Sequence, residues 1–302
     1  MQQQVLEDSM LTEHTNKPVF AVIGGSGLYS MPGLQDVQEH ELTTPFGKPS
    51  TPVIVGNLEG VPVAFLARHG IGHVISPSEV NYRANLYALK SLGVEQVISI
   101  SACGSLRDDY RPGEVVIADQ LFDLTRNRKR SFFGEGLVAH VSVSDPFCAR
   151  LSAELFAAVK ATDNPVHHGG TMITIEGPRF STRAESNVFR SWGMSLIGMT
   201  TSPEAFLARE AEMCYALMAH VTDYDVWHIS EEPVSVEMVV QILNRNTQAA
   251  QESIRVLART IGSSERNCTC DSALASALIT QPDKIPPETR QRLDLLTHKY
   301  LP

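Results

Sequence analysis

The sequence predicts a single α/β domain built on a central mixed β-sheet flanked by helices. Short runs rich in Val, Ile and Thr alternate along the chain with longer segments of helical periodicity, which is typical of α/β proteins. Two neighbouring β-runs at 53–55 and 61–66, with Gly60 near the turn, indicate an antiparallel pair. The sheet should therefore be mixed rather than purely parallel.

The expected strands follow one another from near the start of the chain to residue 219. The runs 19–23 and 213–219 are apolar throughout, as in strands buried on both faces of a sheet. The other expected strands lie at 53–55, 61–66, 97–100, 115–118, 171–175 and 196–199.

Capping signals predict where the helices begin. Ser76 at the N-cap, with Pro77 at N1 and Glu79 at N3, should start a helix that ends near Leu92. Further helix starts are expected at Asp145-Pro146, at Thr182 with Glu185, at Ser202-Pro203 and at Ser235. The last of these helices should be amphipathic, because Val236, Val239, Val240 and Leu243 follow the i, i+3, i+4, i+7 pattern.

The composition is that of a soluble globular protein, with 43% hydrophobic and 20% charged residues. The formal net charge of −9 argues against nucleic-acid binding as the main task. No apolar run approaches the ~18 residues of a membrane span. Because residues 1–8 also lack the basic and apolar regions of a signal peptide, we expect a cytoplasmic protein.

We expect one domain over residues 18–262, preceded by a polar tail over 1–17. Residues 263–302 should form a peripheral extension with one or two short helices that packs on the same domain. In this extension, Cys268-Thr269-Cys270 is compatible with a strained disulfide, half of a metal site or two free thiols. No second Cys or His pair lies nearby along the chain, so zinc is disfavoured and reduced thiols are expected.

The segment Thr222-Asp223-Tyr224-Asp225 follows the buried strand expected at 213–219. Alternate residues of a strand share a face, so Asp223 and Asp225 would point the same way if the strand continued. Two such carboxylates are costly unless a ligand binds them or one stays protonated. A protonated carboxyl suits a ring nitrogen beside an exocyclic amine, as in adenine; a solvated turn is the alternative.

Polar or glycine-rich segments also follow four expected strands. They are Gly24-Gly25-Ser26-Gly27, Arg68-His69-Gly70, Ser101-Ala102-Cys103-Gly104-Ser105 and Met199-Thr200-Thr201. Backbone amides, hydroxyls and an arginine can bind an anion, and ligands of open α/β sheets gather where strands end. Taken singly, the glycines also fit a tight turn, Arg68 a surface position and His69 a packed one. Phe180, which follows the strand at 171–175, fits either stacking on a flat base or a core position.

Together these motifs resemble those of the trimeric purine nucleoside phosphorylases, in particular the members that act on 5′-methylthioadenosine. The resemblance covers about 19–257. It rests on the segments given above and on Thr44-Pro45-Phe46-Gly47-Lys48-Pro49-Ser50 and Thr174-Ile175-Glu176-Gly177-Pro178-Arg179-Phe180. Ser26 stands where the family often has Thr, Gly198 where it often has Asn, and Ser202 where it often has an apolar residue.

The resemblance implies a role for each matched residue. Phosphate would be held by Ser26, Arg68, His69, Ser101, Ala102 and Thr200. The base would be held by Phe180, Ser181, Thr222, Asp223 and Asp225. On chemical grounds, Asp223 can then be the acid for the leaving base if burial and Asp225 raise its pKa. Met199 would lie under the ribose and His73 near it. The 5′ pocket would be formed by Val236, Val239 and Val240, with His140 reaching in from a neighbouring subunit.

The implied activity is phosphorolysis of 5′-methylthioadenosine to adenine and 5-methylthioribose 1-phosphate by a homotrimer. Inorganic phosphate would be a co-substrate, and neither a metal nor an organic cofactor is implied. One alternative is a phosphorylase for 6-oxopurine nucleosides or methylthioinosine, in which an Asn is expected at the base site. A second alternative is a purine-nucleoside sensor without catalytic activity.

Overall fold

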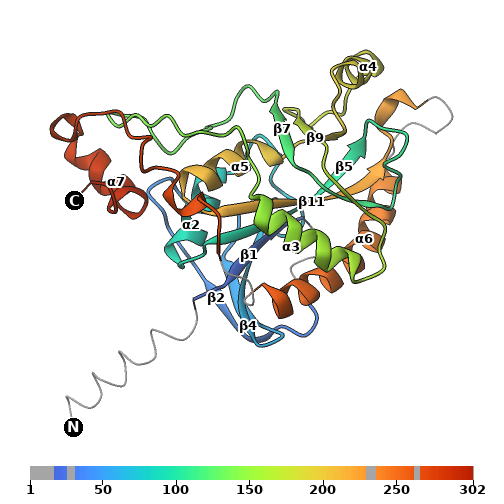
Figure 1. Ribbon diagram of the computed structural model, residues 1–302, viewed down its shortest axis with the longest axis horizontal. Helices are drawn as coiled ribbons and strands as arrows, with labels where there is room; N and C mark the ends of the chain where they lie inside the picture. The colour runs from blue at the N-terminus through green and yellow to red at the C-terminus, as the bar shows by residue number, and fades with distance from the viewer. Residues whose placement is uncertain (1–16, 26–30, 229–235, 262–265, 302) are drawn as a thin grey trace, which may run out of the picture.

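The computed structural model describes residues 17–25, 31–228, 236–261 and 266–301, and within helix α6 the side chains of 236 and 238–245 are left out. The expected tail lies outside this part of the chain, apart from Lys17. The described residues form one mixed sheet with helices on both faces (Figure 1), so the predicted fold class is confirmed. In the same part of the chain, no helix is both long enough and apolar enough to cross a bilayer.

The sheet of the described chain has eleven strands, and all eight expected strands are among them. Their bounds are β1 (Phe20–Gly24), β2 (Gln35–His40), β3 (Val53–Leu58), β4 (Val61–Ala67), β5 (Gln96–Ser105), β6 (Val115–Ile117), β7 (Gln120–Asp123), β8 (Val166–His168), β9 (Thr171–Thr174), β10 (Leu196–Gly198) and β11 (Cys214–Asp223). The sequence did not predict β2, β7 and β8. β2 is polar and exposed, and the other two are short.

Strand β5 organises the sheet. It runs parallel to β11 along most of its length and to β1 over Val97 to Ser99, and its last residues pair antiparallel with β10. The main strand order is β2-β3-β4-β1-β5-β10-β9-β7, with β6 and β8 continuing beyond β11. β3 and β4 are antiparallel, as predicted for the hairpin. Because β4, β1, β5 and β11 are parallel neighbours, their carboxyl ends meet at one edge of the sheet.

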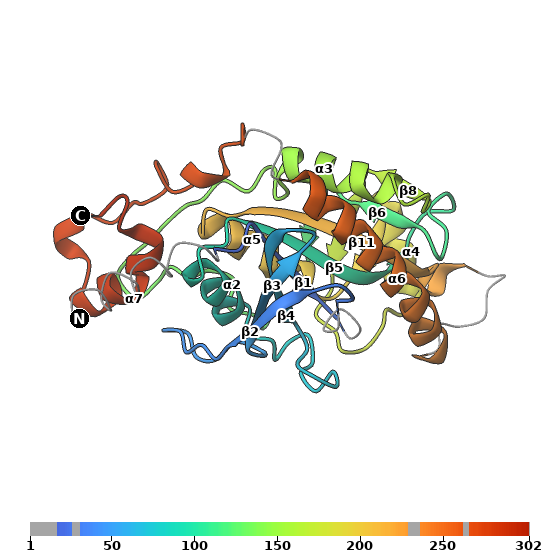
Figure 2. The ribbon, with the colours of Figure 1, turned by 90° about the horizontal axis from the view of Figure 1, so that it is seen from below.

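Two hydrophobic layers hold helices against the sheet (Figures 1 and 2). One layer joins α2 (Tyr82–Ser91) and α5 (Thr201–Glu210), through residues such as Leu86 and Leu207, to one face. The other joins α3 (Ala149–Lys160) and α6 (Val236–Thr260), through residues such as Leu155 and Ile254, to the opposite face. The remaining described helices are α4 (Arg183–Ser191), α7 (Pro287–Thr297) and the short 3₁₀ helices η1 (Asp225–Trp227), η2 (Cys270–Ser272) and η3 (Pro282–Lys284).

The helix predicted from Ser76 starts later, at Tyr82, with Asn81 as its N-cap. Ser76 and Glu79 do pair, with 2.6 Å between the hydroxyl and the carboxylate, but they enclose only a turn. Asn81 accepts a hydrogen bond from the Ala84 N–H and donates to the Phe46 carbonyl oxygen. The regular helix begins where this side chain is anchored.

Helices α4 and α6 begin where the sequence predicts, and α3 does not. The capping box of Thr182 and Glu185 is complete, and α6 begins where expected. Helix α3, predicted from Pro146, begins at Ala149 instead, because Cys148 is extended and its N–H donates to the Tyr215 carbonyl oxygen of β11. The segment before α3 is therefore held against the sheet by backbone pairing.

Residues 266–301 lie beyond α6 and contact the same core as α2 and α5. Ile285, Leu293 and Leu296 belong to that hydrophobic layer. The carboxylate of Glu212 accepts hydrogen bonds from the Leu274 N–H and the Tyr300 hydroxyl. Figure 1 shows α7 at the edge of the molecule, past α2.

A fully buried ion pair joins the strand ends to α5. Arg68, directly after β4, is 1% exposed, and Glu204 is 0% exposed. Both oxygens of Glu204 accept hydrogen bonds from the Arg68 guanidinium at 2.8 Å. Glu204 also accepts from the hydroxyls of Ser99 and Tyr215. This network links β4, β5, β11 and α5 beneath the edge where the strands end.

Replacing Glu204 with alanine should lower the free energy of unfolding by about 3–5 kcal/mol, because Arg68 would stay buried without its counter-charge. The matched control is Asp109→Ala, which removes the exposed ion pair with Arg107 and should cost only ~0.2–1 kcal/mol. Denaturant unfolding at one fixed protein concentration measures both variants. Equal unfolding midpoints for the two variants would contradict a stabilising role for the buried pair.

Candidate active site

A cavity of about 530 Å³ lies at the edge where the parallel strands end. Twelve of the predicted site residues line it: Arg68, His69, His73, Ser101, Ala102, Phe180, Ser181, Met199, Thr200, Thr222, Asp223 and Asp225. They come from loops and strand ends far apart in the sequence. The fold therefore brings the predicted phosphate-binding and base-binding residues into one space.

The remaining predicted residues do not lie in the described cavity wall. Ser26 falls outside the described residues, and so do the side chains of Val236, Val239 and Val240 on α6. His140 is described and exposed, and it is not among the cavity residues. Its N–H donates to the Ala277 carbonyl oxygen in the C-terminal extension. Within one chain, His140 takes no part in this cavity.

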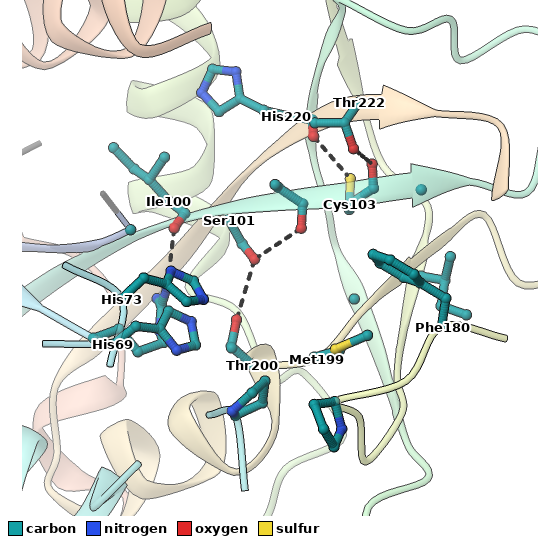
Figure 3. Close-up of a pocket in the computed structure, with 18 of the residues that line it drawn as sticks. His69, His73, Ile100, Ser101, Cys103, Phe180, Met199, Thr200, His220 and Thr222 are labelled. Atoms are coloured by element: carbon teal, nitrogen blue, oxygen red, sulfur yellow. Dashed lines mark hydrogen bonds between the residues drawn. The ribbon is translucent and has the colours of Figure 1, made fainter. Parts of the chain in front are cut away.

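One end of the cavity carries paired hydroxyls and two imidazoles. The Ser101 and Thr200 hydroxyl oxygens are 3.2 Å apart, and both residues are buried. Figure 3 shows these hydroxyls facing each other, with Met199 and Phe180 lying further along the same cavity. The rings of His69 and His73 stack with their centroids 4.3 Å apart. This end offers small polar groups within reach of one tetrahedral oxyanion.

His69 is neutral at physiological pH. Burial, helped by the neighbouring charge of Arg68, lowers the pKa of His69 to about 4. Its Nδ1 lies 2.9 Å from the Ile75 carbonyl oxygen. Because a carbonyl oxygen only accepts, Nδ1 carries the proton, and Nε2 is left as an acceptor. His69 can therefore receive a hydrogen bond from a hydroxyl group.

Arg68 lies in the cavity wall with its guanidinium directed into the protein. Besides Glu204, the guanidinium donates to the Ser99 hydroxyl and to the carbonyl oxygens of Ile100 and Ile23. The bidentate partner of Arg68 in this structure is thus Glu204, and its contact with phosphate stays a prediction. In this arrangement Arg68 holds the floor of the cavity together.

The other end of the cavity carries the two carboxyl groups. The Thr222 hydroxyl lies 2.6 Å from Asp223 Oδ2 and 3.1 Å from the Cys103 carbonyl oxygen. The Asp225 N–H donates to Asp223 Oδ1 at 2.7 Å. Strand β11 ends at Asp223, and Asp225 starts η1 with φ of 50°. The carboxyl groups therefore meet through a sharp turn, and not through the strand alternation expected from the sequence.

Both carboxyl groups are shifted toward their protonated forms. Burial raises the pKa of Asp223, whereas the hydrogen bond from the Asp225 N–H lowers it, although Asp225 was expected to raise this pKa. Burial also raises the pKa of Asp225, and the nearby charge of Asp223 adds to the effect. Gly104 makes this crowding possible, since a Cβ at that position would lie 2.9 Å from Asp223 Oδ1. A carboxyl held protonated here can donate a hydrogen bond or a proton to a ligand.

Several buried polar atoms in the cavity wall have no hydrogen-bond partner within the described part of the chain. They are Ser181 Oγ, Asp225 Oδ2, Asn246 Nδ2 and both ring nitrogens of His220. Buried polar groups are nearly always paired in folded proteins, so a cavity lined with unpaired ones is built for a polar ligand. Burial lowers the pKa of His220 to about 4, so its ring is neutral.

The sequence motifs did not predict His220 and Asn246 as site residues, although each is a polar residue within an apolar pattern. His220 continues the apolar run of β11 and shares a face with Met218. Asn246 precedes Ala250 and Ile254 by helical spacing on the buried face of α6. A polar side chain on an otherwise apolar face indicates a site when it has no partner, and only the structure shows that.

Arg128 is a third residue that the sequence did not reveal. Its guanidinium is buried and donates to the carbonyl oxygens of Met199, Ser202 and Glu176, each at 2.7 Å. It also pairs with the Glu176 carboxylate. These contacts fix the turns that carry Met199 and Thr200 into the cavity, so Arg128 is a positioning residue.

Comparison with known proteins finds close relatives. The S-methyl-5′-thioadenosine phosphorylase of Geobacter sulfurreducens is 54% identical over 284 residues, covering 94% of this chain and 99% of that protein. The protein of the same name from Hyperthermus butylicus is 49% identical over 266 residues, covering 87% of this chain and 96% of that protein.

Solved structures agree with these relatives. A methylthioadenosine phosphorylase from an antarctic soil metagenomic library has a TM-score of 0.89 and 45% identity, covering 93% of this chain and 99% of that one. The methylthioadenosine phosphorylase of Schistosoma mansoni in complex with adenine has a TM-score of 0.81 and 37% identity, covering 86% and 97%. A family model described as the phosphorylase superfamily matches residues 19–260, and the chain belongs to that superfamily.

Proposed function

We propose that this protein catalyses the phosphorolysis of 5′-methylthioadenosine, which yields adenine and 5-methylthioribose 1-phosphate. The observation that carries the proposal is the pairing of two functions in one cavity. Asp223 and Asp225 are held toward protonation at one end, and Ser101, Thr200 and His69 gather at the other. Relatives that share about half of the sequence bear the name of this activity.

The reaction needs charge stabilisation on both sides of the ribose. Phosphate attacks the anomeric carbon on the face away from the base, and the bond from that carbon to adenine N9 breaks. Positive charge develops on the sugar, and the phosphate below it is both nucleophile and counter-charge. The leaving adenine would carry negative charge unless it gains a proton, so an acid beside N7 lowers the barrier.

Asp223 is placed to be that acid. Burial raises the pKa of Asp223 and so favours its protonated form, and Asp225 and Thr222 hold the carboxyl in position. The proton passes from Asp223 to N7 as the bond to N9 breaks. Overall, one proton moves from hydrogen phosphate to adenine, so Asp223 must regain a proton before the next turnover.

On the phosphate side, neutral His69 can bind the protonated oxygen of hydrogen phosphate. Its free acceptor nitrogen can take a hydrogen bond from the P–OH group of hydrogen phosphate, while Ser101 and Thr200 donate to the other oxygens. Met199 and Phe180 supply apolar surface for the sugar and the base, respectively. No metal or organic cofactor enters these steps, and phosphate is a co-substrate.

Two alternatives are less well supported. A phosphorylase for inosine or methylthioinosine must satisfy a 6-oxo group, for which an Asn amide is the expected partner, and the base end here presents carboxyl groups. A nucleoside sensor would need the base-binding groups, but it gains nothing from an acid placed opposite an anion site. We also propose a cytoplasmic location, which the use of inorganic phosphate favours.

A turnover assay with methylthioadenosine, adenosine and methylthioinosine, each with and without phosphate, tests the function. Methylthioadenosine should be the best substrate and should require phosphate. Its kcat/KM should exceed that of adenosine by about 10–200-fold, since an apolar pocket discriminates to that extent against a desolvated hydroxyl. Val236→Ser should reduce that ratio if α6 forms the pocket. Faster turnover of methylthioinosine would favour the 6-oxopurine alternative.

Asp223→Asn should lower kcat for methylthioadenosine by about 10²-fold or more, because the amide cannot supply the proton. Wild-type kcat should fall as the pH rises through the raised pKa of Asp223, since only the protonated carboxyl acts as the acid. This alkaline limb should be absent from the pH profile of the variant. Asp109→Asn, an exposed carboxylate outside the cavity, is the control. Near wild-type turnover by Asp223→Asn would remove Asp223 from the proposed role.

We propose that the chain assembles as a homotrimer in which His140 completes a neighbour's cavity. His140 is exposed and lies outside the cavity of its own chain, so only a second copy can bring it to a 5′ pocket. Light scattering should give the mass of a trimer. His140→Ala should raise the KM for methylthioadenosine severalfold, and an exposed control, His298→Ala, should leave it unchanged. An active monomer would contradict the composite site.

A further inference from the structure

Four of the five cysteines meet at one point outside the active site. Cys148 precedes α3, Cys214 opens β11, and Cys268 and Cys270 lie in the C-terminal extension. Their four Sγ atoms all lie within 4.8 Å of one another. Cys148, Cys214 and Cys270 are buried, and Cys268 is half-buried. None of the four lines the active-site cavity, whereas the fifth cysteine, Cys103, does.

The spacing of these sulfur atoms fits one tetrahedral metal ion. With Zn–S bonds of about 2.3 Å, the sulfurs of a tetrahedral site lie about 3.8 Å apart. Cys214 Sγ and Cys268 Sγ are 3.4 Å apart, and no pair exceeds 4.8 Å. A disulfide would bring two sulfurs to about 2.05 Å and separate the cluster into pairs. An iron–sulfur cluster places several irons and sulfides between its thiolates, which this space does not allow.

Arginines surround the cluster. Arg150 Nη2 lies 3.7 Å from Cys214 Sγ, and Arg209 Nη1 lies 3.4 Å from Cys270 Sγ. Arg266 also interacts with Cys214 and Cys268. A divalent ion bound by four thiolates carries a net charge of −2, and N–H donors on the sulfurs are the usual outer partners of such a site. Arg150 and Arg266 are also paired with Glu154 and Glu95, so the three arginines offset this charge only in part.

We propose that Cys148, Cys214, Cys268 and Cys270 bind one structural Zn²⁺ ion. Four thiolates in a closed tetrahedral site are typical of structural zinc, and soft sulfur ligands bind Zn²⁺ more tightly than Fe²⁺. Binding converts four thiols to thiolates, so four protons leave as the ion enters. No electron transfer is involved.

The ion would fasten the extension to the core. Cys268 and Cys270 belong to residues 266–301, and Cys148 and Cys214 belong to the core. Further along, Leu274 and Tyr300 hydrogen-bond to Glu212 close to the same strand start. The site is thus structural, and its failure would leave the proposed chemistry untouched.

The four-cysteine cluster gives the C-x-C motif a different role from the one its sequence suggests. The sequence disfavours zinc because no second ligand pair lies nearby along the chain. The missing pair comes from Cys148 and Cys214, the latter 54 residues before Cys268, and only folding brings it close.

The test is metal analysis of untagged full-length protein purified under reducing conditions with added zinc. Close to one zinc per chain is expected. Replacement by Co²⁺ should give the near-ultraviolet thiolate-to-cobalt charge-transfer band of a tetrahedral thiolate site. Protein without zinc would overturn the proposal, whether its intact mass is lower by four hydrogens, which indicates two disulfides, or unchanged, which indicates free thiols.

Variants separate this site from adventitious binding. Cys268→Ser/Cys270→Ser should reduce bound zinc to below about a tenth of the wild-type content, and Cys103→Ser should retain it. If the double variant does not fold, the wild type supplies the second measurement: removal of zinc by a chelator should lower its melting temperature, and added zinc should restore it. Zinc retained by the folded double variant, or chelation without any shift in melting temperature, would contradict the proposal.

Discussion

The buried pair of Arg68 and Glu204 is the constraint on which the cavity depends. Charges removed from water are tolerated only when they are fully paired, and here the pairing spans four elements. Arg68 follows β4, Ser99 lies on β5, Tyr215 on β11 and Glu204 on α5. This network fastens α5 and the residue after β4 to β5 and β11. Neighbouring residues, including His69, Ser101 and Thr200, are thereby held around one space.

Above this floor, burial disfavours charge on the titratable groups of the cavity. His69 and His220 are neutral, and burial favours the protonated forms of Asp223 and Asp225. Such a site can bind a neutral nucleoside at one end and an anion at the other without strong repulsion between them. Its carboxyl groups stay able to donate a proton, which the departure of adenine requires.

Local sequence patterns predicted most of the sheet, since the apolar runs gave eight of its strands. Twelve cavity residues followed from the motifs after those strands together with the family resemblance that the motifs carry. Patterns failed where distant contacts decide the outcome. Asn81, anchored to Phe46, moved the start of α2, and Cys148, paired with Tyr215, moved that of α3. The pairing of Arg68 with Glu204 and the cluster of four cysteines also depend on contacts between segments far apart in the sequence. The lack of a partner for the His220 ring, within the described residues, is likewise visible only in the folded chain.

The central claim is that one cavity holds adenine against Asp223 and phosphate against Ser101 and Thr200. A crystal structure of the protein with adenine and phosphate tests this most directly. The account predicts the Asp223 carboxyl within hydrogen-bond distance of N7, partners on the base for Ser181 or Asp225, and phosphate oxygens contacting the Ser101 and Thr200 hydroxyls. Adenine bound with N7 away from Asp223, or phosphate bound outside this cavity, would contradict it.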